Sequence, residues 1–428
     1  MNFQVKQDCI VPYSFSAGSF RALKCVVALF STALFLLVIQ GCATPKRLPA
    51  VPDSLTTNAV IPGIPKARLW ANSPQGMDSL LEYIVERRSI ANRELSLKGL
   101  NQGTLPTQNF LAISGGGDKG AFGAGLLVGW SEAGNRPSFD VVTGISTGAL
   151  IAPLVFIGPE YDQALKTIYT NIGPKDIFKK RYLLDALFDD ALTDSTPLWN
   201  LVEKHVNEEL LERIAEKYHK GPSLFVVTTD LDARLPVFWN MGEIAASSDP
   251  KSLELFRKIL LASASIPAVF PPVMIDVEVD GVAYQEMHVD GSASSQVFLF
   301  PASLGDILRD KGLWIDREMN SYIIRNARLD PNWSSVDRRI FSIMGRAISA
   351  LIQAHGIGDL HQIYYNAKLN DMNFNLAFIG PEFDMEHKED FDTEYMRALF
   401  DYAYQLAREG YPWQKAPPNL VNPNLAEE

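Results

Sequence analysis

The sequence predicts an α/β fold, in which helices cover both faces of a central, mainly parallel sheet. Two observations support this prediction. The apolar run Phe110–Ser114 precedes a glycine-rich turn and a helix of small residues. A second apolar run, Val141–Thr143, again leads through a glycine-containing turn into an apolar helix. Repeated strand–turn–helix units are typical of parallel sheets, because each helix returns the chain to the start of the next strand.

Composition describes a folded chain that is long enough for one large domain or two ordinary ones. Of its 428 residues, 47% are hydrophobic and 21% are charged, which is the balance of a globular protein. The formal net charge of -11 argues against a nucleic-acid partner, which requires a basic surface. The cysteines are Cys9, Cys25 and Cys42, so the chain after Cys42 has neither a disulfide nor a thiol nucleophile.

The first 41 residues have the features of a secretory signal peptide. Basic residues precede the uncharged run 25–39, and small residues follow it, as in a basic, an apolar and a cleavage region. The letters IQGC at 39–42 resemble the lipobox of bacterial lipoproteins. This resemblance implies that Cys42 is acylated and anchors the protein in the cell envelope, with the outer membrane favoured over the inner one. An uncleaved membrane anchor is the alternative, because residues 25–44 carry no charge and 20 such residues can span a bilayer.

The stretch Gly115–Gly125 contains six glycines in eleven residues. Glycine costs about 0.5–1 kcal/mol relative to alanine inside regular structure, so this cluster predicts a backbone that bends sharply or approaches a ligand. Gly115, Gly117 and Gly120 also fit a dinucleotide fingerprint, which requires an acidic residue at the end of the next strand. Asp140 precedes that strand instead. A plain strand–helix junction is the third interpretation of the glycines.

The second turn has the pattern of a nucleophile elbow. Residues 144–148 read Gly-Ile-Ser-Thr-Gly between an apolar strand and an apolar helix, which is the G-x-S-x-G motif in its expected context. Glycine is expected at 144 and 148 because the turn is so tight that a Cβ at either position would collide with the backbone. The residue at the apex, Ser146, projects from the backbone and is the candidate nucleophile.

A serine nucleophile requires a base, and acyl transfer requires hydrogen-bond donors for the oxyanion. The backbone amides of Gly116 and Gly117 can supply these donors at the start of a helix, which gives the glycine cluster a role. Asp290 ends a strand-like run, and Gly291 permits a turn after it. The carboxylate of Asp290 is therefore the candidate base.

The order of these motifs, together with "ASASIPAVFPP" at 262–272, resembles the patatin-like phospholipase family over residues 109–298. The resemblance implies a three-layer α/β/α fold and a Ser146–Asp290 dyad that needs no metal or cofactor. It also assigns the oxyanion loop to Gly115, Gly116, Gly117 and Gly120.

Three positions depart from the family's usual residues. Lys119 replaces the usual arginine of the loop, Ser114 stands where aspartate is common, and Ser292 follows Asp290-Gly291 where glycine or alanine is preferred. These residues retain the general character of the positions, so the resemblance still implies the same mechanism.

Histidines provide an alternative base and a possible support for Asp290. In a Ser-Asp-His triad, His355 or His361 would follow Asp290 in chain order. His288 lies two residues before Asp290, so both side chains point to the same side of a strand. It either supports Asp290 or is a structural histidine.

We therefore expect a membrane-anchored serine lipid acyl hydrolase of phospholipase A or lysophospholipase type, acting on phospholipid or another acyl lipid. A lipid transacylase is one alternative, and a catalytically weak envelope lipoprotein that binds lipid or a partner is another. The expected segments are a signal peptide at 1–41, a lipid-anchored tether at 42–75, a helical extension at 76–106, the catalytic domain at 107–415 and a tail at 416–428.

Overall fold

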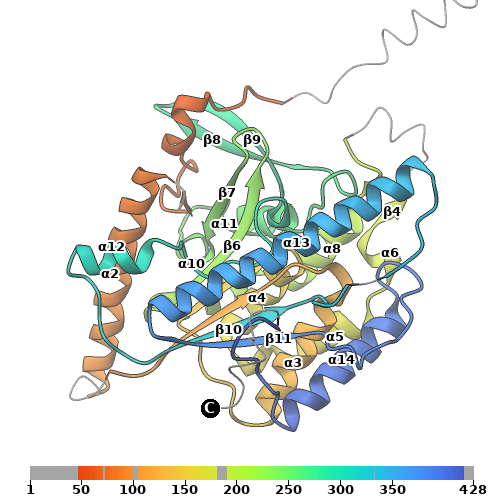
Figure 1. Cartoon of the computed structure of the whole chain (residues 1–428). Coiled ribbons are helices and arrows are strands. Elements are labelled where there is room, and N and C mark those ends of the chain that lie inside the picture. The colour runs from red at the N-terminus through yellow and green to blue at the C-terminus, as the bar shows by residue number, and fades with distance from the viewer. Residues whose placement is uncertain (1–46, 71–72, 100–104, 181–189, 332, 419–428) are drawn as a thin grey trace, which may run out of the picture.

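The protein is known from a computed structural model that describes residues 47–70, 73–99, 105–180, 190–331 and 333–418. Its centre is a nine-stranded sheet with helices on both faces (Figure 1), which confirms the predicted α/β architecture. The predicted signal peptide and Cys42 lie outside the described residues. Among the described residues, no helix combines the length and the apolar character that crossing a membrane requires.

Five neighbouring strands run parallel in the order β6-β3-β2-β10-β11. They are β2 (Gln108–Ile113), β3 (Val141–Ile145), β6 (Ser223–Asp230), β10 (Met319–Arg325) and β11 (Met372–Phe378). On one side of the β2/β10 pair, the sheet continues with β3 and then β6; on the other side, it continues with β11. The strand order therefore reverses direction between β2 and β10. In open α/β sheets, ligands bind beyond the carboxyl ends of the strands near such a point. The glycine loop follows β2 and Ser146 follows β3, so both lie at this edge.

Antiparallel strands extend the sheet beyond β6. They are β1 (Arg68–Leu69), β7 (Leu235–Asn240), β8 (Val273–Val279) and β9 (Val282–Asp290). β7 pairs with β6, and β8 and β9 form a hairpin whose last residues also pair with β6, with Asp290 opposite Thr228. Because β6 also neighbours β3, this pairing brings the predicted base close to the end of the strand that carries Ser146.

The main core fills one face of the sheet. Its helices are α3 (Gly120–Glu132), α4 (Thr147–Ile157), α5 (Asp162–Asn171), α8 (Thr196–His205), α9 (Glu208–Tyr218), α10 (Met241–Ala246), α11 (Ser252–Ser263) and α14 (Thr393–Arg408). The glycines of α3 allow α14 to pack directly on its backbone, since a Cβ at Gly125 would lie 2.2 Å from the carbonyl oxygen of Phe400. Short elements α6 (Pro174–Ile177), β4 (Lys179–Lys180) and β5 (Thr193–Asp194) lie at the margin.

The opposite face is covered by α2 (Pro74–Leu97), α12 (Leu304–Asp310) and α13 (Ile340–Leu369) (Figure 1). Leu80 and Leu81 of α2 are buried with α12, so the segment predicted to be helical packs on the rest of the fold. The second half of α13 buries Leu360 and Ile363 against β10 and β11. Helices on both faces give the three layers that the sequence analysis expected.

The predicted tether at 42–75 is wrong for residues 47–70. Ile61, Ile64 and Trp70 from this segment are buried in the main core. Arg68 forms a buried ion pair with Glu286 of β9. The segment has little regular structure, and its proline-rich composition is that of a linker. Its apolar residues are nevertheless buried. The folded part therefore begins well before the predicted boundary at residue 76.

Candidate active site

Ser146 lies at the apex of the turn between β3 and α4. Its backbone angles, φ 56° and ψ -124°, are strained for a residue with a side chain. The flanking glycines make the turn possible: a Cβ at Gly144 would lie 2.3 Å from the carbonyl oxygen of Gly148, and one at Gly148 would lie 2.2 Å from that of Ile113. The structure therefore gives Ser146 the geometry of a nucleophile elbow.

Ser263, the last residue of α11, secures this turn. Its hydroxyl accepts a hydrogen bond from the Ser146 amide at 3.0 Å and donates to the carbonyl of Val227 in β6 at 2.7 Å. The strained backbone at Ser146 is thus tied to the neighbouring strand. The sequence analysis used this segment only as part of a family resemblance and did not identify Ser263 as a residue of the site.

Asp290 ends β9 and is fully buried. Its Oδ1 accepts a hydrogen bond from the Ser292 amide at 2.7 Å, whereas Oδ2 is buried without a hydrogen-bond partner among the described residues. Burial raises the pKa of Asp290 to about 6, although the hydroxyl of Ser146 and the amide of Ser292 oppose this rise. Because the Ser146 hydroxyl is close enough to lower this pKa, the two side chains are neighbours. An ionised carboxylate with a free oxygen can accept a proton near neutral pH.

The glycine loop after β2 lies against this pair. A Cβ at Gly115 would lie 2.6 Å from the Ser292 hydroxyl and 3.2 Å from the Cβ of Ser146, so only a glycine fits between them. The Gly115 amide donates to the carbonyl of Gln296 at 3.2 Å. The next two amides, of Gly116 and Gly117, have no acceptor in the described part of the chain. They are available to bind an oxyanion.

Gln296 connects the glycine loop to α13. Its amide donates to Oδ2 of Asp359 in α13 at 2.6 Å, and its side chain donates to the Ser292 carbonyl at 2.8 Å. Since its own carbonyl accepts from the Gly115 amide, two consecutive hydrogen bonds link Asp359 to the loop. The segment after Asp290 thereby contacts both the Asp290 carboxylate and the glycine loop.

Asn326, which follows β10, holds the other side of the glycine loop. Its amide donates to the Ser114 hydroxyl at 2.8 Å and its Nδ2 to the Ser114 carbonyl at 2.9 Å. Its Oδ1 accepts from the amide of Gly123 at 3.0 Å. A Cβ at Gly116 would lie 2.2 Å from the Asn326 carbonyl oxygen, so the loop backbone passes directly over this residue. The sequence analysis did not single out Asn326.

We expect Asn326→Asp to lower kcat by about 10- to 100-fold and to destabilise the fold by roughly 1–3 kcal/mol, the cost of an unsatisfied buried polar group. The substitution keeps the shape and the acceptor for Gly123, but it places a carboxylate oxygen against the Ser114 carbonyl. Ester hydrolysis and thermal unfolding of the purified variant measure both effects. Asn320→Asp, in β10 and partly exposed, is the matched control; equal losses in the two variants would contradict this role of Asn326.

The remaining loop residues have distinct positions. A Cβ at Gly120 would lie 2.1 Å from the Thr147 hydroxyl, so this glycine lets α3 and α4 begin side by side. Lys119 is half-exposed, and its amide donates to the Gly116 carbonyl at 3.2 Å. Its side chain makes no hydrogen bond or ion pair with described residues. A supporting role for Lys119 stays a prediction.

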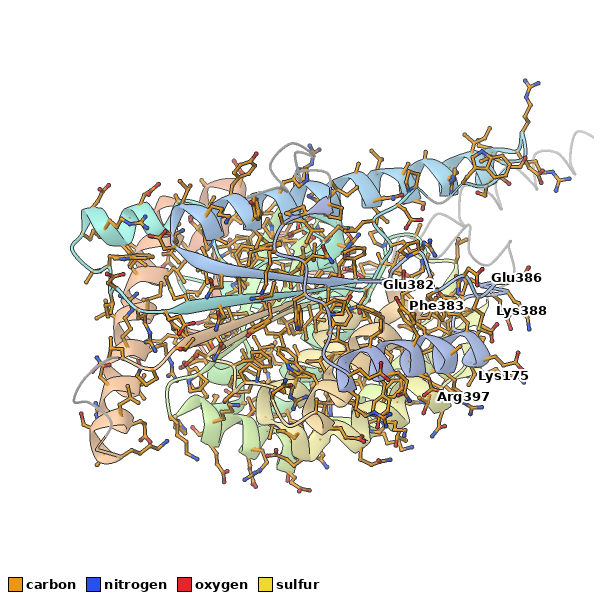
Figure 2. The ribbon with its side chains drawn as sticks, turned by 60° about the horizontal axis from the view of Figure 1, so that its bottom comes forward. Lys175, Glu382, Phe383, Glu386, Lys388 and Arg397 are labelled. Atoms are coloured by element: carbon orange, nitrogen blue, oxygen red, sulfur yellow. The ribbon has the colours of Figure 1, made fainter. Side chains whose placement is uncertain are left out.

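Asp118 joins the glycine loop to the chain after β11. Its buried Oδ2 lies 2.5 Å from Nε2 of His387 and accepts from the amide of Phe391 at 2.9 Å. Glu386 and Lys388, from the same connecting segment, lie at the end of the molecule where β11 leaves the sheet (Figure 2). This segment therefore borders the carboxyl edge that holds the candidate site.

The histidines that could serve as a conventional base lie elsewhere. His355 in α13 is 3.6 Å from Asp359, and its side chain is 42% exposed. His361, also in α13, has a buried Nε2 without a described partner. Neither has a described interaction with Asp290, so the structure does not assemble the alternative triad.

His288 belongs to a buried network on β9. Its Nδ1 lies 2.8 Å from the Thr228 hydroxyl and its Nε2 lies 3.1 Å from Glu286, which also pairs with Arg68. His288 and Asp290 share a strand face as expected, but no described interaction joins them. The contacts fit a structural histidine. Among the described residues, no group of three or more His, Cys, Asp or Glu side chains could hold a metal ion.

Comparisons with known proteins identify one family. The model of the patatin-like phospholipase family matches residues 111–302, which contain Ser146, Asp290 and the glycine loop. No curated protein sequence matches this chain. Among solved structures, the crystal structure of VipD from Legionella pneumophila is aligned over 72% of this chain and 67% of its own, with 12% identity and a TM-score of 0.31.

Proposed function

Because the model of the patatin-like phospholipase family matches residues 111–302, we propose that this protein hydrolyses acyl esters of lipids with a Ser146–Asp290 dyad. The family places the protein among lipid acyl hydrolases in general. One observation supports the finer proposal most strongly: a serine held in a strained turn faces a buried carboxylate whose pKa is raised to about 6. The amides of Gly116 and Gly117 in the adjoining loop have no acceptor in the described part of the chain and could donate to an oxyanion.

The reaction would proceed in two steps. Ser146 Oγ attacks the ester carbonyl while Asp290 takes its proton, and the Gly116 and Gly117 amides bind the developing oxyanion. The alcohol then leaves with the proton from Asp290, which gives an acyl-serine. Asp290 next removes a proton from water, the hydroxide attacks the acyl carbonyl, and release of the fatty acid returns the proton to Ser146.

The proposed hydrolysis is tested with the full-length protein and mixed bacterial lipids, by mass spectrometry of the products. A free fatty acid and a lysolipid are expected, and Ser146→Ala should yield neither. Transfer of the acyl group to a lipid alcohol would instead favour the transacylase. If the wild-type chain releases no acyl group and Ser146 also fails to react with a fluorophosphonate, the catalytic proposal is wrong.

The exposed face of α13 supports the proposal that the protein encounters its substrate in a lipid surface. Ile340, Ile343, Ile348 and Leu351 recur on one side of this helix, and each is at least 52% exposed. Arginines at 338, 339 and 346 accompany them, and no acidic residue occurs between 338 and 358. A helix with an apolar face and basic flanks suits the interface of an anionic membrane.

We expect Ile343→Asp combined with Leu351→Asp to lower kcat/KM on phospholipid in mixed micelles at least 10-fold, with little effect on a soluble short-chain ester. Charged side chains on this face would oppose its insertion between lipids without touching the dyad. The ratio of the two activities measures the effect. Ser349→Asp, exposed on the same helix but turned away from the apolar face, serves as the control. An unchanged ratio in the double variant would exclude α13 from substrate access.

We also propose that the chain is a lipoprotein anchored through Cys42 at the periplasmic side of the outer membrane. The proposal is supported by the apolar run that ends at Gly41-Cys42. Wild-type protein should carry a diacylglyceryl group by mass spectrometry and partition into detergent, whereas Cys42→Ser should accumulate as unprocessed precursor. Cys25→Ser controls for the loss of a cysteine. A Cys42→Ser protein with mature size and unchanged membrane association would refute the anchor.

A further inference from the structure

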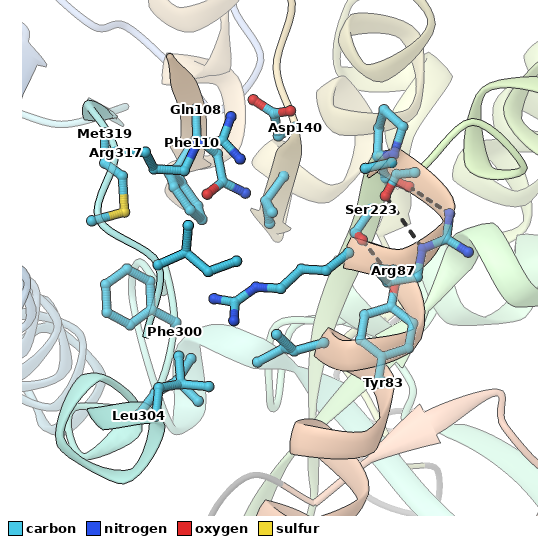
Figure 3. Close-up of a pocket in the computed structure, with 18 of the residues that line it drawn as sticks. Tyr83, Arg87, Gln108, Phe110, Asp140, Ser223, Phe300, Leu304, Arg317 and Met319 are labelled. Carbon is cyan, nitrogen blue, oxygen red and sulfur yellow. Dashed lines mark hydrogen bonds between the residues drawn. The ribbon is translucent and has the colours of Figure 1, made fainter. Parts of the chain in front are cut away.

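A cavity of about 340 Å³ lies at the end of the sheet opposite to Ser146, between the sheet, α2 and α12 (Figure 3). The first residues of all five parallel strands line it: Gln108, Val141, Ser223, Met319 and Met372. Ser146 follows the other end of β3, about 16 Å from Val141 at about 3.3 Å per residue. This cavity is therefore separate from the candidate active site.

The walls of the cavity are mainly apolar. Phe110 and Phe300 line one side with their rings edge to face, at 6.1 Å between centroids. Figure 3 shows Phe300, Leu304 and Met319 on the side opposite Tyr83. The volume lies at the lower end of the roughly 300–1,000 Å³ range of small-molecule pockets. This size and lining suit a ligand with a single apolar chain better than a lipid with two chains.

The lining also carries an excess of positive charge. Five cationic side chains and two acidic ones contribute to it, namely Arg87, Arg88, Lys98, Lys220 and Arg317, with Glu94 and Asp140. Since the whole chain has a net charge of -11, this concentration of cations is a local property. A cavity with apolar walls strengthens the attraction of such cations for an anion.

Arg88 and Arg317 have hydrogen-bonding capacity that the protein does not use. Arg88 donates to the Leu313 carbonyl and Arg317 to the Pro106 carbonyl, but neither forms an ion pair with a described carboxylate. Nε of Arg317 is buried without a partner. Burial lowers the pKa of both guanidinium groups, and their mutual repulsion lowers that of Arg88 further.

Arg87 differs from this pair because its donors are satisfied. It donates to the carbonyls of Tyr218 and Gly221 and lies 3.7 Å above the ring of Tyr218. Asp140 is the acidic group that acts on Arg317, but its Oδ2 already accepts from the Asn109 amide. Two half-buried guanidinium groups thus lack the acceptor that a ligand carboxylate would provide.

We propose that this cavity binds a free long-chain fatty acid, with its carboxylate between Arg88 and Arg317 and its chain along the apolar wall. An uncharged alcohol of the same length would leave both arginines without an acceptor. The inference rests on the proposed function only for the source of the ligand, because that reaction would release a fatty acid. Binding itself requires no catalysis.

The test uses palmitate with a photoreactive diazirine in its chain and the full-length Ser146→Ala protein, in which no acyl-serine forms. After irradiation, mass spectrometry should map the label to peptides of α2 or α12, and unlabelled palmitate should compete. The corresponding photoreactive alcohol should label these peptides at least 10-fold less. Because the nucleophile is absent, failure of the proposed hydrolysis would leave this result unaffected.

Variants test the two parts of the site separately. Arg88→Gln combined with Arg317→Gln should reduce the labelling of α2 and α12 at least 10-fold, while Arg213→Gln on the surface of α9 should not. Leu304→Trp, which fills the apolar part of the cavity and keeps both arginines, should also reduce the labelling. If the double variant does not fold, the labelling of Leu304→Trp tests the proposal. Circular dichroism verifies the fold. Label in other elements, or labelling that persists in the folded variants, would overturn the proposal.

Discussion

Substitution of Ser146 by alanine or of Asp290 by asparagine is expected to lower kcat at least about 1,000-fold, because each removes a group that takes part in bond formation or proton transfer. The double variant should be no slower than the slower single variant, since the two residues act as a unit. Hydrolysis of a short-chain ester measures these losses. Ser292→Ala, whose amide still donates to Asp290, is the matched control. A folded Asp290→Asn chain with near-wild-type kcat would refute the dyad.

The raised pKa of Asp290 predicts opposite effects of pH on activity and stability. As a base, Asp290 must be ionised, so kcat/KM of the wild type should rise with pH to a plateau above about 6. The folded chain retains this proton up to about pH 6, whereas the unfolded chain releases it near 3.8. The folded state therefore binds more protons between these values, and the free energy of unfolding falls as pH rises through them.

Asp290→Asn should consequently be more stable than the wild type at pH 8 while being inactive. The pKa difference between 3.8 and about 6 corresponds to about 3 kcal/mol, which is the largest gain expected from removing the buried charge. At pH 4 the two proteins should have similar stability, because Asp290 is then protonated in the folded state. Urea unfolding at both pH values tests this. A variant that is less stable at pH 8 would show that the carboxylate is not penalised by burial.

The second large effect is expected for Gly116→Ala. The new methyl group would lie 2.2 Å from the Asn326 carbonyl oxygen, and Asn326 is fixed by its bonds to Ser114 and Gly123. The loop must therefore shift, which moves the amides proposed to bind the oxyanion. A lost oxyanion donor costs about 100- to 1,000-fold in kcat, so we expect a decrease of this size.

Gly134→Ala provides the control for Gly116→Ala. Gly134 has φ +77° and nothing within 4 Å of its added Cβ, so the substitution introduces backbone strain without a collision. It should cost roughly 1–2 kcal/mol of stability and leave kcat unchanged. Comparable kcat values for folded Gly116→Ala and the wild type would mean that these amides do not contribute to catalysis.

Local patterns made the two strand–turn–helix units and Ser146 predictable from the sequence. The glycines that the nucleophile turn requires lie within two residues of Ser146. The tight turn and the residue at its apex can therefore be recognised from one short stretch of sequence. Ser263 and Asn326 could not be found in this way. Their hydrogen bonds to Ser146 and Ser114 join residues 117 and 212 positions apart, and nothing in the nearby sequence distinguishes them from other small polar residues.

The boundaries of the fold were harder to predict than its centre. Residues 47–70 contain few periodic apolar positions, because they pack through turns and a two-residue strand. At the other end, β10 and β11 complete the parallel sheet although they lie beyond the residues that the family model matches. Asn326 follows β10, so a contact that holds the glycine loop comes from outside the matched range.

Helix α13 has a consequence beyond its proposed contact with a lipid surface. Its first half exposes the apolar face, and its second half carries Asp359, which is joined to Gly115 through Gln296. Any displacement of α13 on contact with lipid would therefore be transmitted to the loop backbone that we propose binds the oxyanion. Turnover would then depend on the physical state of the substrate, remaining low for dispersed monomers and increasing abruptly once they assemble into micelles.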